Sequence, residues 1–248
     1  MRSERCGAYY GIDAPGLVAQ FAILGIAGLL VGVGSYLAAT SGHVRWMRFL
    51  PAPSVSIGAT FLATAGGMIL GSRWGKLRLR DRIISSIPWR GDESVLDVGC
   101  GRGLMLIAAA KRLTTGTAAG VDLWQTEDQS GNSRETTLRN AQLENVAERV
   151  TLKDGDARKL EFADGSFDVV LSSWAIHNIY DAPGRELAIR EMVRVLKPGG
   201  WLVVVDIRHT SEYSRVLEQC LMQNVRRAGP SFVFIIPSFT LTASKRVK

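Results

Sequence analysis

The sequence predicts an α/β domain with a mainly parallel sheet, preceded by a hairpin of two membrane-spanning helices. Two uncharged stretches and one glycine-rich turn lead to this fold class. Residues 14–42 and 49–72 contain no Asp, Glu, Lys, Arg or His, and each is long enough to cross a bilayer as a helix. Residues 95–98 form a short apolar run that ends in the glycine-rich turn, as a buried strand does before a helix.

Three regions follow from this pattern. We expect residues 1–72 to be a membrane anchor, residues 73–91 a basic juxtamembrane linker, and residues 92–248 the α/β domain. A pair of buried soluble helices is the alternative for the anchor, but helices that are apolar on all sides need a large protein around them. A cleaved signal peptide is disfavoured, because Glu4 and Asp13 precede the first apolar stretch and no clear A-x-A site follows it.

The positive charge is concentrated beside the anchor. The net charge is +7, and residues 1–90 contain 10 Lys and Arg against 3 Asp and Glu, whereas residues 91–248 contain 20 of each sign. A nucleic-acid enzyme would carry its basic patch on the catalytic domain, so we expect no nucleic-acid partner. The densest cluster follows the second span and consists of Arg73, Lys76, Arg78, Arg80 and Arg82. Because basic residues flank the cytoplasmic ends of spans, we expect an integral membrane protein whose termini and α/β domain face the cytoplasm.

Small residues and cysteines add two expectations. Gly28-xxx-Gly32 and Gly67-xxx-Gly71 would let helices approach closely, either within the hairpin or in a homo-oligomer. The three cysteines show no paired spacing and no histidine pattern for zinc, so we expect no disulfide and no metal.

The elements of the remaining chain follow in a regular order. A linker helix is expected at 77–87, and the strand at 95–98 is followed by an apolar helix at 104–113. The elements expected after these are a strand at 117–121, a polar helix at 133–145, strands at 149–153, 167–173 and 201–205, a helix at 211–227, and strands at 232–236 and 239–243.

The turn after residue 98 carries the most specific motif. It consists of Gly99, Cys100, Gly101, Arg102 and Gly103, with Asp97 two residues before the first glycine. Missing Cβ atoms let a ligand approach the backbone. A dinucleotide-binding turn would instead read G-x-G-x-x-G, which argues against a nicotinamide oxidoreductase. The motif resembles the first motif of class I S-adenosylmethionine-dependent methyltransferases, in which this loop wraps the methionine part of the cofactor.

The resemblance extends along the chain and covers residues 92–248. It implies a Rossmann-like methyltransferase domain with a mixed seven-stranded sheet, S-adenosylmethionine as cofactor and S-adenosylhomocysteine as product. Leu196-Lys-Pro-Gly-Gly200 is a landmark of the same superfamily. The cofactor-binding residues that the resemblance implies are Asp97, Gly99, Gly101, Gly103, Asp122, Asp156, Ala157 and Ser173.

Two of these assignments have plain structural alternatives. Asp122 ends the second strand, 19 positions beyond Gly103, where the family's acidic residue binds the ribose hydroxyls, but it also suits a helix cap or loop. Asp156 matches the position beside the adenine amino group, but it also suits a simple turn.

The chemistry implied by the resemblance is in-line displacement at a sulfonium methyl group. The protein mainly has to align the reacting atoms, and a general base is needed only when the acceptor must lose a proton. His177 and Asp206 follow the strands at 167–173 and 201–205, and they are the candidate catalytic residues. The alternative for His177 is a hydrogen bond within a loop, and the alternative for Asp206 is the stabilisation of a turn. Arg208 and His209 also follow the strand at 201–205.

The leading hypothesis is a membrane-anchored methyltransferase that acts on a small lipophilic acceptor. The motifs are similar to those of the broad group that contains quinone-biosynthesis, phospholipid and sterol methyltransferases. The alternative is a non-catalytic membrane protein that binds S-adenosylmethionine or S-adenosylhomocysteine as a regulatory ligand.

Overall fold

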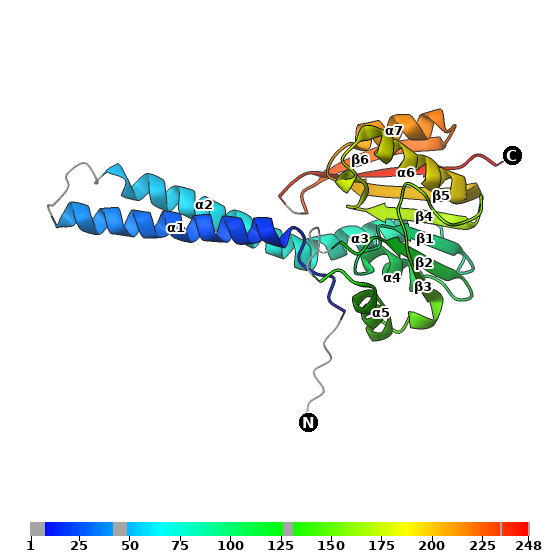
Figure 1. The fold of residues 1–248 in the computed structure, drawn as a ribbon, viewed down its shortest axis with the longest axis horizontal. Helices are drawn as coiled ribbons and strands as arrows, with labels where there is room; N and C mark the ends of the chain where they lie inside the picture. Colours follow the sequence, from blue (N-terminus) through cyan, green and yellow to red (C-terminus); the bar gives the residue numbers. More distant parts are fainter. Residues whose placement is uncertain (1–7, 42–48, 126–130, 234, 248) are drawn as a thin grey trace, which may run out of the picture.

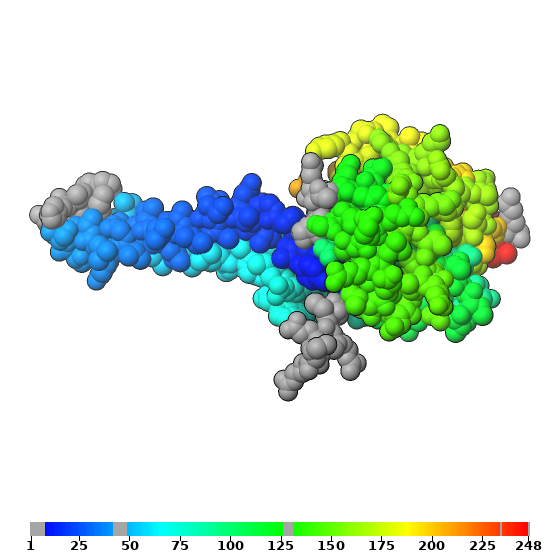
Figure 2. Space-filling model, turned by 60° about the horizontal axis from the view of Figure 1, so that its bottom comes forward, coloured from blue at the N-terminus to red at the C-terminus, as the bar shows by residue number. Residues whose placement is uncertain are grey.

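The protein consists of a long helical hairpin that projects from an α/β domain (Figure 1). The computed structural model describes residues 8–41, 49–125, 131–233 and 235–247. Figure 2 shows one face of the molecule, on which the hairpin extends from the rounded domain as a narrow rod.

The hairpin is formed by α1 (Pro15–Thr40) and α2 (Pro51–Leu70). A short π-helical segment, η2 (Gly71–Gly75), continues α2 without a break into α3 (Lys76–Ser86). Both long helices are apolar and long enough to cross a membrane, and only 17% and 22% of their most apolar windows are buried. Their sides therefore present apolar surface that the α/β domain does not cover.

Glycines let the two helices of the hairpin approach closely. A Cβ atom added to Gly28 would lie 2.9 Å from the Cα atom of Gly58, and one added to Gly32 would lie 2.6 Å from a methyl group of Val55. The Gly28-xxx-Gly32 pair thus packs within the hairpin. Gly67 instead faces a residue of the α/β domain, Ile235.

The α/β domain is built on a seven-stranded mixed sheet, as the sequence predicts. Its order is β3-β2-β1-β4-β5-β7-β6; β1 to β5 are parallel, and β7 runs antiparallel to both β5 and β6. The strands are β1 (Ser94–Val98), β2 (Thr117–Asp122), β3 (Val150–Asp154), β4 (Phe167–Ser173), β5 (Leu196–Asp206), β6 (Gln223–Ser231) and β7 (Ser238–Ser244). The strand order reverses between β1 and β4, where ligands bind in sheets of this kind.

Helices cover both faces of the sheet. They are α4 (Leu104–Ala110), α5 (Arg134–Leu143), α6 (Ala182–Val195) and α7 (Thr210–Gln219), with short 3₁₀ segments at η3 (Ala147–Arg149) and η4 (Ile176–Asn178). Successive side chains of a strand pack on opposite faces of the sheet: Val95 packs with α3 and α4, whereas Leu96 packs with α6 and α7. This explains why the parallel strands are apolar without alternation.

The C-terminal region differs from the sequence-based expectation. The helix expected at 211–227 ends at Gln219, and Gln223–Ser231 is strand β6. The expected strand at 232–236 is not a strand, and its described residues lie in the loop between β6 and β7. β6 is an exposed edge strand, so its polar side chains match the pattern of a helix surface, and pairing with β7 decides its conformation.

Candidate cofactor and active site

The glycine turn after β1 has a backbone that side chains would obstruct. Gly99 and Gly103 have φ angles of +70° and +84°. A Cβ atom at Gly99 would lie 2.2 Å from the Cβ atom of Ala175, which follows β4. Because this space has no room for a side chain, only glycine brings the turn so close to the end of β4.

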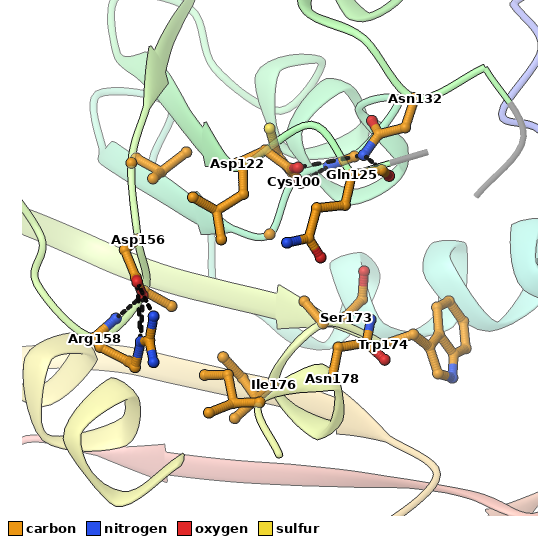
Figure 3. A pocket seen from close by; sticks show the side chains of 18 of the residues that line it. Cys100, Asp122, Gln125, Asn132, Asp156, Arg158, Ser173, Trp174, Ile176 and Asn178 are labelled. Carbon is orange, nitrogen blue, oxygen red and sulfur yellow. Dashed lines mark hydrogen bonds and ion pairs between the residues drawn. The ribbon is translucent and has the colours of Figure 1, made fainter. Parts of the chain in front are cut away.

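A cavity of about 370 Å³ lies at the carboxyl ends of the strands, beside this turn. Its volume falls within the range of small-molecule sites. The predicted site residues on its lining are Gly99, Gly101, Asp122, Asp156, Ala157 and Ser173. Figure 3 shows Asp122 and Asp156 on one side of the cavity and Ser173, Trp174 and Asn178 on the other. The structure thus gathers six of the eight predicted cofactor residues around one space.

Asp122 connects the turn to the wall of the cavity. One oxygen, Oδ2, accepts a hydrogen bond from the backbone N–H of Gly101 at 2.7 Å, and the other, Oδ1, accepts from the backbone N–H of Trp124 at 2.6 Å. The side-chain amide of Asn132 also donates to Oδ1, at 3.3 Å (Figure 3). A carboxylate offers about four lone-pair sites, so Asp122 retains accepting capacity toward the cavity.

Asp156 is engaged by Arg158, which the sequence analysis did not single out. Oδ2 of Asp156 accepts hydrogen bonds from Nη2 of Arg158 at 2.5 Å and from Nε of Arg158 at 2.9 Å (Figure 3). These hydrogen bonds lower the pKa of Asp156, so the group is ionised near neutral pH. A ligand at this wall meets a carboxylate and a guanidinium together, since Arg158 also lines the cavity.

Asp97 and Gly103 lie behind the cavity lining. Asp97 is fully buried, and its Oδ2 accepts from the backbone N–H of Leu106 at 2.9 Å. Its Oδ1 has no hydrogen-bond partner among the described residues. Burial raises the pKa of Asp97 to about 7. The carboxyl group therefore ties the start of α4 to β1 from within the core.

His177 and Asp206 lie together, but outside the lining of the cavity. Nδ1 of His177 is 2.6 Å from Oδ1 of Asp206, although the ring N–H is not aligned for a hydrogen bond. The fully buried Asp206 accepts from the backbone N–H groups of His177 at 3.0 Å and Ile207 at 2.8 Å, and from the hydroxyl of Tyr213 at 3.3 Å. The neighbours of His177 on both sides, Ile176 and Asn178, do line the cavity.

The segment before the helical hairpin also reaches this cavity. Asp13 lines it, two residues before α1 begins. Lys76 is 1% exposed, and its Nζ donates to Oδ2 of Asp13 at 2.7 Å and to the carbonyl oxygens of Tyr10 and Gly11 at 2.8 and 2.9 Å. No spacing rule links residues 63 positions apart, so the sequence alone shows Asp13 only as a charge before the first apolar stretch.

Comparison with known proteins assigns the α/β domain to a family. Residues 96–204 match the family described as "Methyltransferase domain". The match covers less than half of the chain, and this stretch is similar to methyltransferase domains. The protein is 34% identical over 132 residues to 27-O-demethylrifamycin SV methyltransferase of Amycolatopsis mediterranei, a match that covers 52% of this chain and 44% of the relative. It is also 34% identical over 128 residues to demethylmenaquinone methyltransferase of Staphylococcus aureus, which covers 51% of this chain and 48% of the relative.

The chain spans less than half the length of these curated relatives. Among solved structures, the [4+2]-cyclase SpnF superposes with a TM-score of 0.59 at 18% identity, covering 71% of this chain and 83% of that one. This likeness shows the fold of the methyltransferase domain alone. Since a cyclase shares the fold, activity has to be argued from the site.

The site of the methyltransferase domain fits S-adenosylmethionine. Gly99 and Gly101 of the turn line the cavity, and Asp122 keeps an accepting position on Oδ2 for a hydroxyl group of a ligand. The cavity also has the volume of a small-molecule site. Within the described residues, no three His, Cys, Asp or Glu side chains form a group that could hold a metal ion.

Proposed function

We propose that this protein is a membrane-anchored methyltransferase that transfers a methyl group from S-adenosylmethionine to a small lipophilic acceptor at the membrane surface. The observation that carries this proposal is the position of Asp13. It lines the cavity and lies two residues before α1, the first apolar helix. With the hairpin in a bilayer, the rim of the cavity therefore lies where lipid meets water.

The proposed cofactor site uses the residues gathered at the strand ends. The turn at Gly99 and Gly101 lies against the methionine part, and Asp122 accepts the ribose hydroxyls. Asp156 and Ala157 lie beside the adenine, and Ser173 borders the reacting end. Bound S-adenosylmethionine supplies a methyl group on a positively charged sulfur, so the residues of the cavity mainly hold acceptor, methyl carbon and sulfur in line.

His177 is the proposed base for an acceptor that must lose a proton. Asp206 holds the backbone of His177 and lies beside its ring, so it fixes the segment from which the side chain acts. His177 itself does not line the cavity, so its ring has to turn toward the cavity to reach an acceptor. An acceptor that needs no proton removal leaves His177 with a positioning role only.

The acceptor is proposed to be small and lipophilic. Two curated relatives are named for small-molecule substrates, rifamycin and menaquinone precursors. An enzyme held on the membrane shares one surface with a lipid-soluble acceptor, which raises their effective concentration. The basic residues after the second apolar stretch favour a cytoplasmic catalytic domain.

Calorimetric titration of the detergent-solubilised full chain tests the cofactor first. S-adenosylmethionine, S-adenosylhomocysteine and NAD are titrated in parallel, and we expect the first two to bind and NAD not to bind. Binding of NAD alone, or of none of the three, overturns the proposal. If the first two bind, lipid extracts are then screened for methyl transfer from labelled S-adenosylmethionine. Binding without a methylated product would favour the alternative, a non-catalytic cofactor-binding membrane protein.

A further inference from the structure

We propose that the loop between β6 and β7, in its described residues 232, 233 and 235–237, is a second membrane contact, which dips into the bilayer surface beside α2. This inference rests on the proposed anchoring of the hairpin. Its partner is the phospholipid bilayer that α1 and α2 span.

The loop lies against the end of the hairpin that joins the α/β domain. A Cβ atom added to Gly67 of α2 would lie 2.6 Å from Cδ1 of Ile235, and one added to Gly75 of η2 would lie 3.2 Å from Cγ1 of Val233. In Figure 1 the loop leaves the domain as an orange and red segment that points toward the base of the hairpin. Two loop side chains thus lie on one continuous helical rod.

The contact at Gly67 sets the depth of the loop. Gly67 lies inside the uncharged stretch at 49–72, six residues before Arg73, the first charged residue after it. At 1.5 Å of rise per residue, Gly67 lies roughly 9 Å from Arg73 along the helix axis, toward the middle of the uncharged stretch. A loop that contacts Gly67 therefore reaches past the level of the basic cluster into the apolar part of the bilayer.

The loop has the composition that this depth requires. No Asp, Glu, Lys, Arg or His occurs between Arg227 and Lys245. Phe232 is 67% exposed, Ile235 48% and Ile236 40%, so large apolar side chains face outward beside the apolar hairpin. Such a continuous patch is costly in water and is stabilised by acyl chains. Trp74, also exposed, lies in η2 directly after Arg73, at the level where aromatic side chains favour the membrane interface.

The strand that follows the loop contacts a residue of the cavity wall. Ser238, which begins β7 directly after the loop, accepts a hydrogen bond at its Oγ from Nε1 of Trp174 at 3.1 Å. Trp174 lines the cavity. One hydrogen bond thus links the end of the loop to the cavity wall, so a membrane contact of the loop would hold this wall close to the lipid surface.

Depth-dependent quenching in vesicles tests this contact. The full chain carries Cys6→Ser and Cys220→Ser and one new cysteine for a polarity-sensitive fluorophore, at Phe232→Cys or, as a second position, Ile236→Cys. The remaining native cysteine, Cys100, is buried. The protein is reconstituted in phosphatidylcholine and phosphatidylglycerol vesicles that carry a nitroxide near the top of the acyl chain.

Two reference labels separate the possible failures. Leu30→Cys marks the middle of α1, and Leu221→Cys marks an apolar side chain, 79% exposed, that follows α7 away from the loop. We expect the labels at 232 and 236 to shift to shorter wavelength and lose most of their fluorescence to the nitroxide lipid. The label at 221 should keep its fluorescence.

The outcomes distinguish this inference from the anchoring on which it rests. If a label at 30 is quenched by a nitroxide deep in the acyl chain while those at 232 and 236 are not quenched, the hairpin spans the bilayer and the loop contact is wrong. If none is quenched, the anchoring itself fails. Labels at 232 and 236 that shift to shorter wavelength without quenching would show that protein, such as a second copy of this chain, covers the loop instead of lipid.

Discussion

Asp122 bonds to two backbone N–H groups at the cavity wall and faces the position proposed for the ribose. We expect Asp122→Ala to weaken the binding of S-adenosylmethionine by about 2 kcal/mol or more, because hydrogen bonds to a charged group are lost and the turn loses its support. His177→Ala should leave binding nearly intact and lower turnover. Calorimetric titration and a methyl-transfer assay measure both effects, and equal loss of binding in the two variants would remove His177 from the acceptor side.

Asp97 makes the stability of the protein depend on pH in an unusual direction. Its pKa is raised to about 7 in the folded state, above the ordinary value of 3.8. Between these values the folded protein holds one proton that the unfolded chain has released, so this group's contribution to stability falls as pH rises. We expect the free energy of unfolding of Asp97→Asn, which stays neutral, to rise relative to that of the wild type by on the order of 3–4 kcal/mol between pH 4 and 7.5. Thermal unfolding of the ligand-free protein at several pH values measures this, and parallel curves would contradict it.

Lys76 holds the segment before α1 by three hydrogen bonds. Lys76→Met should lower the free energy of unfolding by on the order of 3 kcal/mol, because buried carbonyl groups and Asp13 lose their partner. The control is Glu186→Gln, which breaks the exposed ion pair between Glu186 and Arg190. It should change the free energy of unfolding by less than about 1 kcal/mol. Chemical denaturation in detergent compares the two, and equal effects would mean that Lys76 does not act as a buried partner.

Among the elements, the hairpin depends on glycine at its crossing. Gly28→Leu should weaken the packing of α1 on α2 by about 1–3 kcal/mol, because its side chain would collide with Gly58. Gly34→Leu in the same helix is the matched control, since a Cβ atom there meets nothing within 4 Å. Both variants are unfolded with a denaturing detergent and followed by circular dichroism, and the mole fraction of detergent at the midpoint of unfolding is compared. A larger effect at Gly34 would mean that this face packs elsewhere.

The sequence predicted the buried elements better than the exposed ones. β4 was expected at its observed bounds, because a central parallel strand is apolar throughout. The helix expected at 211–227 extends over residues 223–227, the first part of β6, since Arg226 and Arg227 on an exposed edge carry no strand signal. The site divides in the same way: the glycine turn has a local motif, whereas Asp13 and Arg158 reach the cavity only through tertiary packing.

At the scale of the whole molecule, the distribution of basic residues predicts the orientation in the membrane. Ser41→Cys, at the end of α1, should react with a membrane-impermeant maleimide only from the outside of cells. Val247→Cys, exposed at the C-terminus, should react only after the cytoplasmic side is opened. Cys6→Ser and Cys220→Ser provide the background. Reaction of both positions from the same side would contradict a two-span hairpin.

The hydrogen bonds of Lys76 join the start of α1 to the start of α3, so they fix the catalytic domain relative to the hairpin. In the proposed membrane-anchored enzyme, a domain fastened in this way would keep one height above the lipid surface. The cavity would then select acceptors by how far the reactive atom projects from the membrane, and the length of the hydrocarbon tail would matter little. Acceptors that share this projection would compete for the enzyme even where their tails differ.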